Sequence, residues 1–491
     1  MLDAPLSSVP ITSSSEPCLK LADLTSGRHG DHAPVLLPRE ALGRLREDLL
    51  GPALARHEGD VFLGARNIYT DRELFELEMK HLFEGGWVYA AHESQMPKPH
   101  DFMSFTVGRQ PVLLTRDADG AVHGFYNACL HRGARVCREK VGNRKVHMCR
   151  FHGWCYNNRG ELVNVTAEKD GAYPTGFNRK DFGLVPLPHV ESYRGFIFVS
   201  LGADVISLKE FLGDAARFID VLVDQSPTAE LEVLSGETAY TYSGNWKLAA
   251  ENGVDGYHVP TVHQNYLMTV AERAKTPTDG APTKTFDISK WGQGEAGFFG
   301  FANGHALLYG PYFNYEDRPS YSQYDHYAQT LSPEHADWIV KRFRNLLLMP
   351  NVLLMDQMSS QIRLIRPISV DLTEVVTWCI APKGEAPEQR EKRIRQYEDF
   401  FNAAGMATPD DLAEFRNCQL GYAATGVPYS DLSRGQQRWV QGANETAQRF
   451  GIKPLLSSTQ TSDEGVYVAI LDQWRERMTQ AVDRELKKAA S

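Results

Sequence analysis

The alternation of apolar and polar positions predicts a helix near the start of the chain. Over residues 71–83, apolar side chains recur three or four residues apart, which places them on one face of a helix. Thr70 and Glu73 match a capping box at its start, and Gly85 ends it. The preceding residues 1–35 are rich in Ser and Pro and predict a loosely ordered arm.

From residue 87 to about residue 201 the pattern changes to short strands separated by turns. Turn sequences between runs of β-forming residues are typical of hairpins. The expected elements are a hairpin at 111–126 around Asp117-Ala-Asp-Gly120, a hairpin at 153–165 around Asn157-Asn-Arg-Gly160, and a strand at 195–201. This part of the chain predicts a small all-β module.

Strands and helices mix after residue 201. Runs rich in Ile, Val and Thr predict neighbouring strands, and apolar residues at helical spacing predict helices. The expected elements are strands at 359–367 and 373–381 and helices at 389–404 and 466–488. The fold class is therefore α+β, with expected divisions at 1–59, 60–200 and 201–491.

Composition narrows the class of protein. A chain of 491 residues predicts two to four domains, and its net charge of −10 argues against a nucleic-acid surface. No apolar run approaches the roughly 18 residues of a membrane span, and the first residues lack the features of a secretory signal. We therefore expect a cytoplasmic protein, where clustered cysteines indicate a metal site more than disulfides.

The first candidate metal site lies inside the β module. Cys129-Leu-His131 and Cys149-Arg-Phe-His152 form two mixed pairs, which suit a [2Fe–2S] cluster with thiolates on one iron and imidazoles on the other. Zinc is a weaker alternative, because zinc fingers pair Cys with Cys and His with His. Buried free cysteines and core histidines are the structural alternative. Cys137 and Cys155 are expected to be packing residues.

A second candidate site follows in the mixed region, where Asp255, His258 and His263 form the pattern D-x2-H-x4-H. A facial triad of two histidines and one carboxylate leaves iron positions open for O₂. Histidines five residues apart diverge by about 140° on a straight helix, so they converge only if the helix is broken, for which Pro260 is the candidate. Core histidines are again the alternative.

Two carboxylates compete for the third position. Spacing alone favours Asp255. The distant pair Asp410-Asp411 reads as first-turn acids of a helix with Thr408 as N-cap and Pro409 as first residue, and this structural explanation is complete in itself.

The segment C-L-H-R-G-A…C-R-F-H-G-W resembles the Rieske ferredoxin-like domain. From about residue 60 the chain resembles the large (alpha) subunit of aromatic-ring-hydroxylating dioxygenases, in the benzoate, toluate, 2-halobenzoate and anthranilate 1,2-dioxygenase branch. The segments that carry the resemblance are FELEMKHLFEGGWVYAAHESQ, GNWKLAAENGVDGYH, RQYEDFF and GMATPDDLAEFR. It implies an all-β Rieske domain inserted in a larger α+β catalytic domain with an antiparallel sheet surrounded by helices.

The resemblance also implies residue roles. Cys129, His131, Cys149 and His152 would hold the cluster, and His258, His263 and Asp411 the mononuclear Fe(II). Asp255 would link that iron to His152 of the partner subunit in a trimer, and Asn252 would lie beside the iron, with a capping Asn as its alternative.

The implied activity is cis-dihydroxylation of an aromatic carboxylate with O₂. Electrons would come from NADH through a separate flavin and iron–sulfur reductase, and a small beta subunit would complete an alpha3beta3 assembly. The resemblance is weakest across 267–325 and at Gln264, which leaves anthranilate or a substituted benzoate open beside benzoate. A monooxygenase on the same scaffold and a non-catalytic Rieske electron carrier are the alternative functions.

Overall fold

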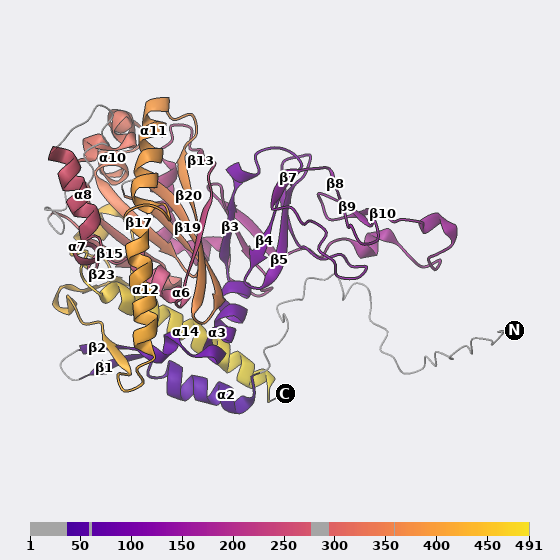
Figure 1. Cartoon of the computed structure of the whole chain (residues 1–491), viewed down its shortest axis with the longest axis horizontal. Helices are drawn as coiled ribbons and strands as arrows, with labels where there is room; N and C mark the ends of the chain where they lie inside the picture. The colour runs from indigo at the N-terminus through magenta and orange to yellow at the C-terminus, as the bar shows by residue number, and fades with distance from the viewer. Residues whose placement is uncertain (1–36, 58–60, 276–293, 358, 491) are drawn as a thin grey trace.

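The computed structural model describes residues 37–57, 61–275, 294–357 and 359–490. Its larger part is built on an antiparallel ten-stranded sheet, drawn on the left of Figure 1. The order is β13-β20-β19-β18-β17-β16-β15-β23-β22, with β14 also paired to β20. The strands are β13 Leu231–Val233, β14 Thr238–Tyr242, β15 Gly297–Gly300, β16 Ala306–Pro311, β17 Arg342–Leu348, β18 Val352–Asp356, β19 Ser360–Ser369, β20 Leu372–Pro382, β22 Val440–Gln441 and β23 Leu456–Ser457.

Helices surround this sheet (Figure 1). They are α2 Arg39–Arg44, α3 Arg72–Glu78, α4 Leu208–Leu212, α5 Ala216–Val223, α6 Trp246–Asn252, α7 Val259–Val262, α8 Gln264–Lys275, α9 Tyr324–Thr330, α10 Pro333–Val340, α11 Pro387–Gln396, α12 Thr408–Tyr422, α13 Glu445–Phe450 and α14 Gly465–Lys488. Within the described residues, none is both long and apolar enough to cross a bilayer.

The two faces of the sheet bury different sets of side chains, because neighbouring residues of a strand point to opposite faces. Phe343, Leu353 and Ile365 belong to one core cluster together with Trp246 of α6. Leu346, Leu354 and Leu364 lie on the same three strands but point to the opposite face, and they belong to a second cluster that includes residues of α5 and α10. We call these the α6 face and the α10 face.

The β module projects from this body (Figure 1). It consists of three small antiparallel sheets, in the orders β6-β5-β4-β7, β10-β9-β8 and β11-β12-β3. The strands are β3 Val88–His92, β4 Asp101–Val107, β5 Gln110–Arg116, β6 Val122–Tyr126, β7 Val141–Asn143, β8 Val146–Met148, β9 Cys155–Asn157, β10 Leu162–Asn164, β11 His189–Tyr193 and β12 Phe196–Ser200. Both expected hairpins are present, as β5–β6 and β9–β10.

Segments before and after the β module pack together, so the module is an insertion. β1 (Leu54–His57) and β2 (Val61–Ala65) form a small sheet with the distant β21 (Tyr429–Asp431). Leu74 of α3 and Trp474 of α14 lie in the same core cluster. The α+β fold with an inserted all-β module is confirmed.

Several expected element ends are wrong in detail. Asp71, not Thr70, caps α3: its side chain accepts a hydrogen bond from the Leu74 amide at 2.8 Å, while the Thr70 hydroxyl donates to the Asn67 carbonyl. The helices expected at 71–83 and 389–404 both continue from an α-helix into a π-helical turn, at Met79–Glu84 and Tyr397–Phe401. The expected arm at 1–35 lies outside the described residues.

A buried carboxylate ties three helices together. Glu78 of α3 accepts hydrogen bonds from Trp246 Nε1 and Lys247 Nζ of α6 and from Trp474 Nε1 of α14, at 2.9, 2.7 and 2.9 Å. Glu78 is fully buried, and Lys247 is its ion-pair partner. The chain runs from α6 directly into the second candidate site. The hydrogen bonds of Glu78 therefore fix the helix from which that site begins.

Replacing Glu78 by Ala is expected to lower the free energy of unfolding by about 3–5 kcal/mol, because the buried Lys247 charge loses its partner. Denaturant unfolding followed by circular dichroism measures this. Glu76→Ala is the matched control on the same helix, since Glu76 pairs with Arg109 at the surface and such pairs contribute about 0–1 kcal/mol. Equal destabilisation by the two substitutions would contradict the assignment.

Candidate active site

The D-x2-H-x4-H segment follows α6, contains the four-residue helix α7 and ends where α8 begins. Asn245 caps α6 by accepting from the Lys247 amide, and the helix ends at Asn252. Gly256 lies against the backbone of Thr461, so closely that a Cβ on it would be 2.5 Å from the Thr461 carbonyl oxygen. His258 then precedes α7, and His263 lies between α7 and α8.

The expected break in the helix is present, but it falls at His263. Pro260 lies in the first turn of α7, where proline is tolerated, and His263 leaves the helical conformation with φ −94° and ψ 24°. As a result the Nε2 atoms of His258 and His263 lie only 3.3 Å apart. The two histidines that a straight helix would separate converge on one point.

Asp411 completes a group of three. It lies in the first turn of α12, buried, with Oδ1 3.5 Å from His258 Nε2 and 3.4 Å from His263 Nε2. Ala407, not Thr408, is the N-cap of α12, and the Thr408 hydroxyl donates to the Phe401 carbonyl instead. Asp411 is therefore both a first-turn acid and a neighbour of the two histidines.

The geometry of these three groups suits one metal ion. Ligands about 2.1 Å from an ion and at right angles to one another would be about 3.0 Å apart, close to the separations found. In the part of the chain that the structure describes, His258, His263 and Asp411 are the one set of three such residues whose ligand atoms all lie within 4.8 Å. Two imidazole nitrogens and one carboxylate oxygen fit non-haem Fe(II).

Asp255 stands outside this triangle. Its Oδ2 lies 2.9 Å from Nδ1 of His258, on the side of the ring away from Nε2. Burial opposes a charge on His258, but the hydrogen bond and charge of Asp255 outweigh it and raise the pKa of that ring. Burial lowers the pKa of His263, which keeps its lone pair available. Spacing alone favours Asp255 as the third metal ligand, whereas in the structure it contacts the nitrogen of His258 that faces away from the other two candidate ligands.

Asn252 lies beside the group formed by His258, His263 and Asp411. Its amide nitrogen is 3.2 Å from Asp411 Oδ1 and 3.3 Å from His258 Nε2. The amide therefore reaches the ligand atoms themselves and is not a capping group.

Two pockets flank the group. The apolar pocket contains His258, His263 and Asp411 and is lined mainly by Tyr266, Leu267, Phe343, Met355, Phe400 and Phe401. Its other polar lining residues are Asn252, Asp255, Asn345, Gln357, Arg363 and Thr408. The acidic pocket lies on the Asp255 side and is lined by Glu251, Asp255, Asp411, Glu414, Asp431 and Glu464. Burial, together with the charge of Asp255, raises the pKa of Glu251 and of Glu464 to about 7.

The first candidate site is formed by two loops of matching conformation. The amide of Gly133 donates to the Cys129 carbonyl and that of Gly153 to the Cys149 carbonyl, at 2.8 and 2.9 Å. Both glycines have positive φ, 75° and 72°, which side chains rarely adopt. A Cβ on Gly153 would also meet the Thr166 hydroxyl at 2.3 Å. Glycine is therefore required at the same point of each loop.

These loops bring the four expected ligands together. The ring centroids of His131 and His152 are 4.4 Å apart, at the molecular surface, whereas Cys129 and Cys149 are buried. Burial raises the pKa of the Cys129 thiol, so a thiolate there needs a metal ion to compensate it. Two buried thiols beside two imidazoles at the surface fit a [2Fe–2S] cluster with thiolates on one iron and imidazoles on the other.

Tyr156 was not singled out in the sequence, but its hydroxyl lies 3.2 Å from Cys129 Sγ. Cys137 and Cys155 are free thiols outside the ligand set. In Figure 1 the loops around β8 to β10 lie far to the right, while α7 lies at the left edge. The two candidate metal sites of one chain are therefore far apart.

Comparisons with known proteins agree with this geometry. The family model described as Rieske [2Fe-2S] domain matches residues 86–192, and the model described as ring hydroxylating alpha subunit (catalytic domain) matches residues 230–451. The chain is 47% identical over 421 residues to the toluate 1,2-dioxygenase subunit alpha of Pseudomonas putida, covering 86% of this chain and 92% of that protein. It is 45% identical over 440 residues to the anthranilate 1,2-dioxygenase large subunit of Acinetobacter baylyi, covering 88% and 93%.

Among solved structures, naphthalene 1,2-dioxygenase with bound indole shares the fold, with a TM-score of 0.73 at 22% identity, covering 88% of this chain and 96% of that one. Three observations assign the chain to a family: the matched domains, the identities over most of both chains, and the two candidate metal sites. The chain belongs to the Rieske non-haem iron ring-hydroxylating dioxygenases, as a large (alpha) subunit of these oxidoreductases, which carry a [2Fe–2S] cluster and a mononuclear iron.

Proposed function

We propose that this chain cis-dihydroxylates an aromatic carboxylate, using O₂ and electrons that a separate reductase takes from NADH. The observation that carries the proposal is the group His258, His263 and Asp411 at the wall of an apolar pocket. A pocket of aromatic and aliphatic side chains with few polar groups suits a flat ring. The relatives named for toluate and anthranilate support an aromatic acid.

The residue roles follow the geometry. We assign His258, His263 and Asp411 as ligands of Fe(II), and Cys129, His131, Cys149 and His152 as ligands of the Rieske cluster. When bound, the cluster supplies single electrons and the iron supplies a centre for O₂ activation.

The chain's own residues prepare the iron site. Asp255 accepts the Nδ1 proton of His258, so the lone pair of that ring is left on Nε2. Asn252 donates to Asp411 Oδ1 and holds the carboxylate in one orientation. The aromatic lining of the apolar pocket excludes water from the reacting ring and fixes its plane.

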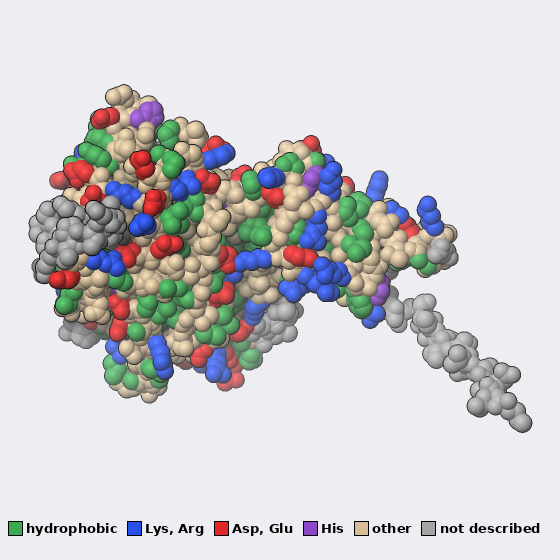
Figure 2. Space-filling view, turned by 45° about the horizontal axis from the view of Figure 1, so that its top comes forward, with side chains coloured by type: hydrophobic (Ala, Val, Ile, Leu, Met, Phe, Trp, Pro, Cys, Tyr) green, Lys and Arg blue, Asp and Glu red, His purple; other side chains and the backbone are tan. Residues whose placement is uncertain are grey.

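We further propose that electrons reach the iron from the partner subunit in a ring-shaped trimer, with a small beta subunit in an alpha3beta3 assembly. The separation of the two sites within one chain supports this (Figure 1). Basic side chains gather over the β module in Figure 2. Arg132 and Arg135, which follow His131 in the first cluster loop, are exposed. Their charge complements the acidic pocket beside Asp255, so that Asp255 would bond to His152 of the partner subunit. The free thiols are compatible with the cytoplasm.

Isotope counting tests the proposed reaction. Enzyme, reductase and NADH are incubated with benzoate, 3-methylbenzoate or 2-aminobenzoate under ¹⁸O₂, and the label in the product is counted by mass spectrometry. We expect two labelled atoms in one product molecule from at least one acid. A single label would replace the proposal by monooxygenation, and no oxidation of any acid would remove the substrate class.

Replacing Tyr156 by Phe is expected to lower the reduction potential of the cluster. The hydroxyl contacts Cys129 Sγ, and a hydrogen bond to sulfur stabilises the reduced, more negative state. Protein-film voltammetry measures the potential, while the Rieske absorption confirms that the cluster is intact. Tyr173→Phe in the same module is the control, and an unchanged potential in Tyr156→Phe would show that the hydroxyl does not donate to the sulfur.

A further inference from the structure

The buried arginines of the larger part of the chain differ in whether they have an acidic partner. Four arginine side chains are buried in the part of the chain that the structure describes: Arg318, Arg344, Arg363 and Arg393. A buried guanidinium without a counter-charge is costly, so buried arginines normally have acidic partners.

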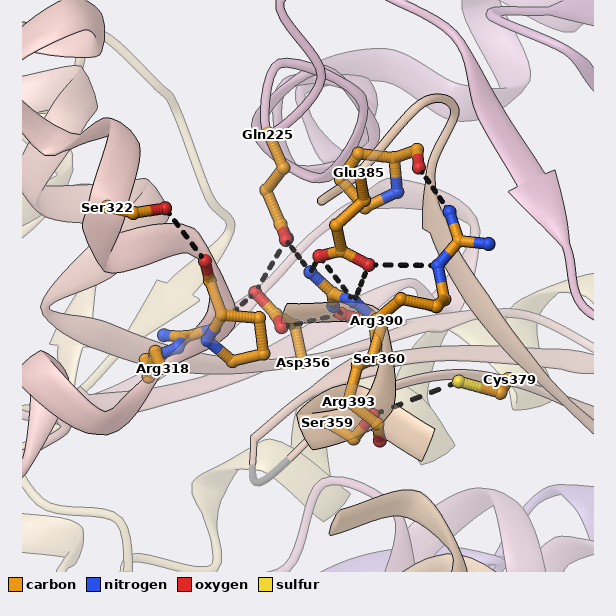
Figure 3. A network of polar contacts seen from close by, with 12 residues as sticks. Gln225, Arg318, Ser322, Asp356, Ser359, Ser360, Cys379, Glu385, Arg390 and Arg393 are labelled. Atoms are coloured by element: carbon orange, nitrogen blue, oxygen red, sulfur yellow. Dashed lines mark hydrogen bonds and ion pairs between the residues drawn. The ribbon is translucent and has the colours of Figure 1, made fainter. Parts of the chain in front are cut away.

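Three of the four have such partners. Arg318 and Arg344 both pair with Asp356, and Arg393 pairs with Glu385 at 2.7 Å. Figure 3 shows the part of this network around Asp356, Glu385 and Arg393. Ser360 and Gln225 also contact Arg393 there. Each of these three arginines therefore has a carboxylate of the chain within ion-pair distance, although Arg318 and Arg344 share one.

Arg363 lies on the other face of the sheet. Arg344 stands opposite Asp356 in the β17–β18 pairing, whereas Arg363 stands opposite Leu353, an α6-face residue. Because side chains alternate along β19, Arg363 points away from the network that holds Ser360 and towards the α6 face. There it lines the apolar pocket together with His258 and Asp411.

No ion-pair partner of Arg363 occurs among the described residues. It is 4% exposed, and its Nε is fully enclosed without a hydrogen-bond acceptor. The two acidic side chains that line the apolar pocket are already engaged, Asp255 with His258 and Asp411 with the two histidines. The counter-charge missing from this pocket is therefore one that a ligand could bring.

We infer that the guanidinium of Arg363 receives the carboxylate of the aromatic substrate, an inference that rests on the proposed function. Guanidinium and carboxylate match as a bidentate pair, and a water-poor pocket strengthens the bond. Since Arg363 and the candidate iron ligands line the same pocket, an acid held by Arg363 has its ring among Phe343, Met355 and Phe400, beside the iron site. Arg363 is thus a positioning residue that selects anionic rings.

Ligand binding separates this role from others. We expect Arg363→Met to weaken binding of benzoate or 2-aminobenzoate by at least about 100-fold in isothermal titration calorimetry. Binding of neutral benzamide should be unchanged or tighter, and Arg363→Lys should recover part of the affinity for the acids. Arg366→Met, on the same strand but outside the apolar pocket and paired with Glu374, is the control and should bind all three compounds like the wild type.

The melting temperature gives a second test of the role of Arg363. A ligand-binding role predicts that its replacement raises the melting temperature, whereas a structural role predicts that it lowers it. Without ligand, Arg363→Met should raise the melting temperature, because it removes an uncompensated buried charge. Arg393→Met should lower it, because Glu385 loses its partner. Destabilisation by Arg363→Met comparable to that of Arg393→Met would overturn the inference.

The outcomes distinguish this inference from the proposed function. If the wild type binds and oxidises aromatic acids while Arg363→Met binds them equally well, Arg363 does not receive the carboxylate, and the proposed function stands. If the wild type neither binds nor oxidises any of the acids, the substrate class fails and the inference fails with it. Loss of acid binding with retained benzamide binding supports both.

Discussion

Replacing His258 by Ala is expected to abolish oxidation of aromatic acids while the Rieske absorption stays unchanged. The substitution leaves His263 and Asp411 as the remaining donors of a group whose three atoms lie 3.3–3.5 Å apart. Two donors hold Fe(II) far less firmly than three, so the iron content should fall from about three to about two atoms per chain. Metal analysis and oxygen uptake with reductase and NADH measure both effects.

His326→Ala is the matched control, because His326 is exposed on α9 outside both pockets. It should leave iron content and activity unchanged. Retained activity in His258→Ala, with iron content equal to that of the control, would show that His258 is not a ligand.

Replacing Asp255 by Ala is expected to leave both metal centres occupied but to slow electron transfer between them by about 100-fold. Asp255 contacts the far nitrogen of His258 and does not touch the position that the three ligand atoms face. The cluster is reduced, mixed with O₂ and a bound aromatic acid, and its reoxidation is followed by stopped-flow absorbance in a single turnover.

Glu414→Gln removes a charge from the same acidic pocket without touching His258 and is the control. It should leave the reoxidation rate close to that of the wild type. Reoxidation in Asp255→Ala as fast as in Glu414→Gln would exclude Asp255 from the proposed route between subunits.

The periodic parts of the fold could be predicted from the sequence. The strands expected at 359–367 and 373–381 are the paired β19 and β20, and the helix expected at 466–488 is α14 to within one residue. Helix starts were less predictable, because Thr70 and Asp71 are both good capping residues and only their contacts decide between them. The divisions expected at residues 60 and 200 stay a prediction.

The candidate site was only partly readable from spacing. His258 and His263 could be paired only on the assumption of a broken helix, and Asp411 came from the family resemblance, since its place in the first turn of α12 explains it fully. In the structure, Asp411 lies in the first turn of α12 and also beside His258 and His263. Arg363 was not predictable among the 52 Lys and Arg, because its direction depends on the register of three strands. An Arg between Ile362 and Leu364 was the available signal.

The central claim is that one chain holds an electron relay and a separate iron that consumes its electrons. Mild chelation of the purified protein, followed by metal analysis, electron paramagnetic resonance and oxygen uptake, tests it most directly. We predict that about one of about three iron atoms is removed, that the Rieske signal persists, and that uptake dependent on an aromatic acid is lost and returns with Fe(II) alone. Full uptake after removal of that iron, or a protein in which cluster and uptake can only be lost together, would contradict the claim.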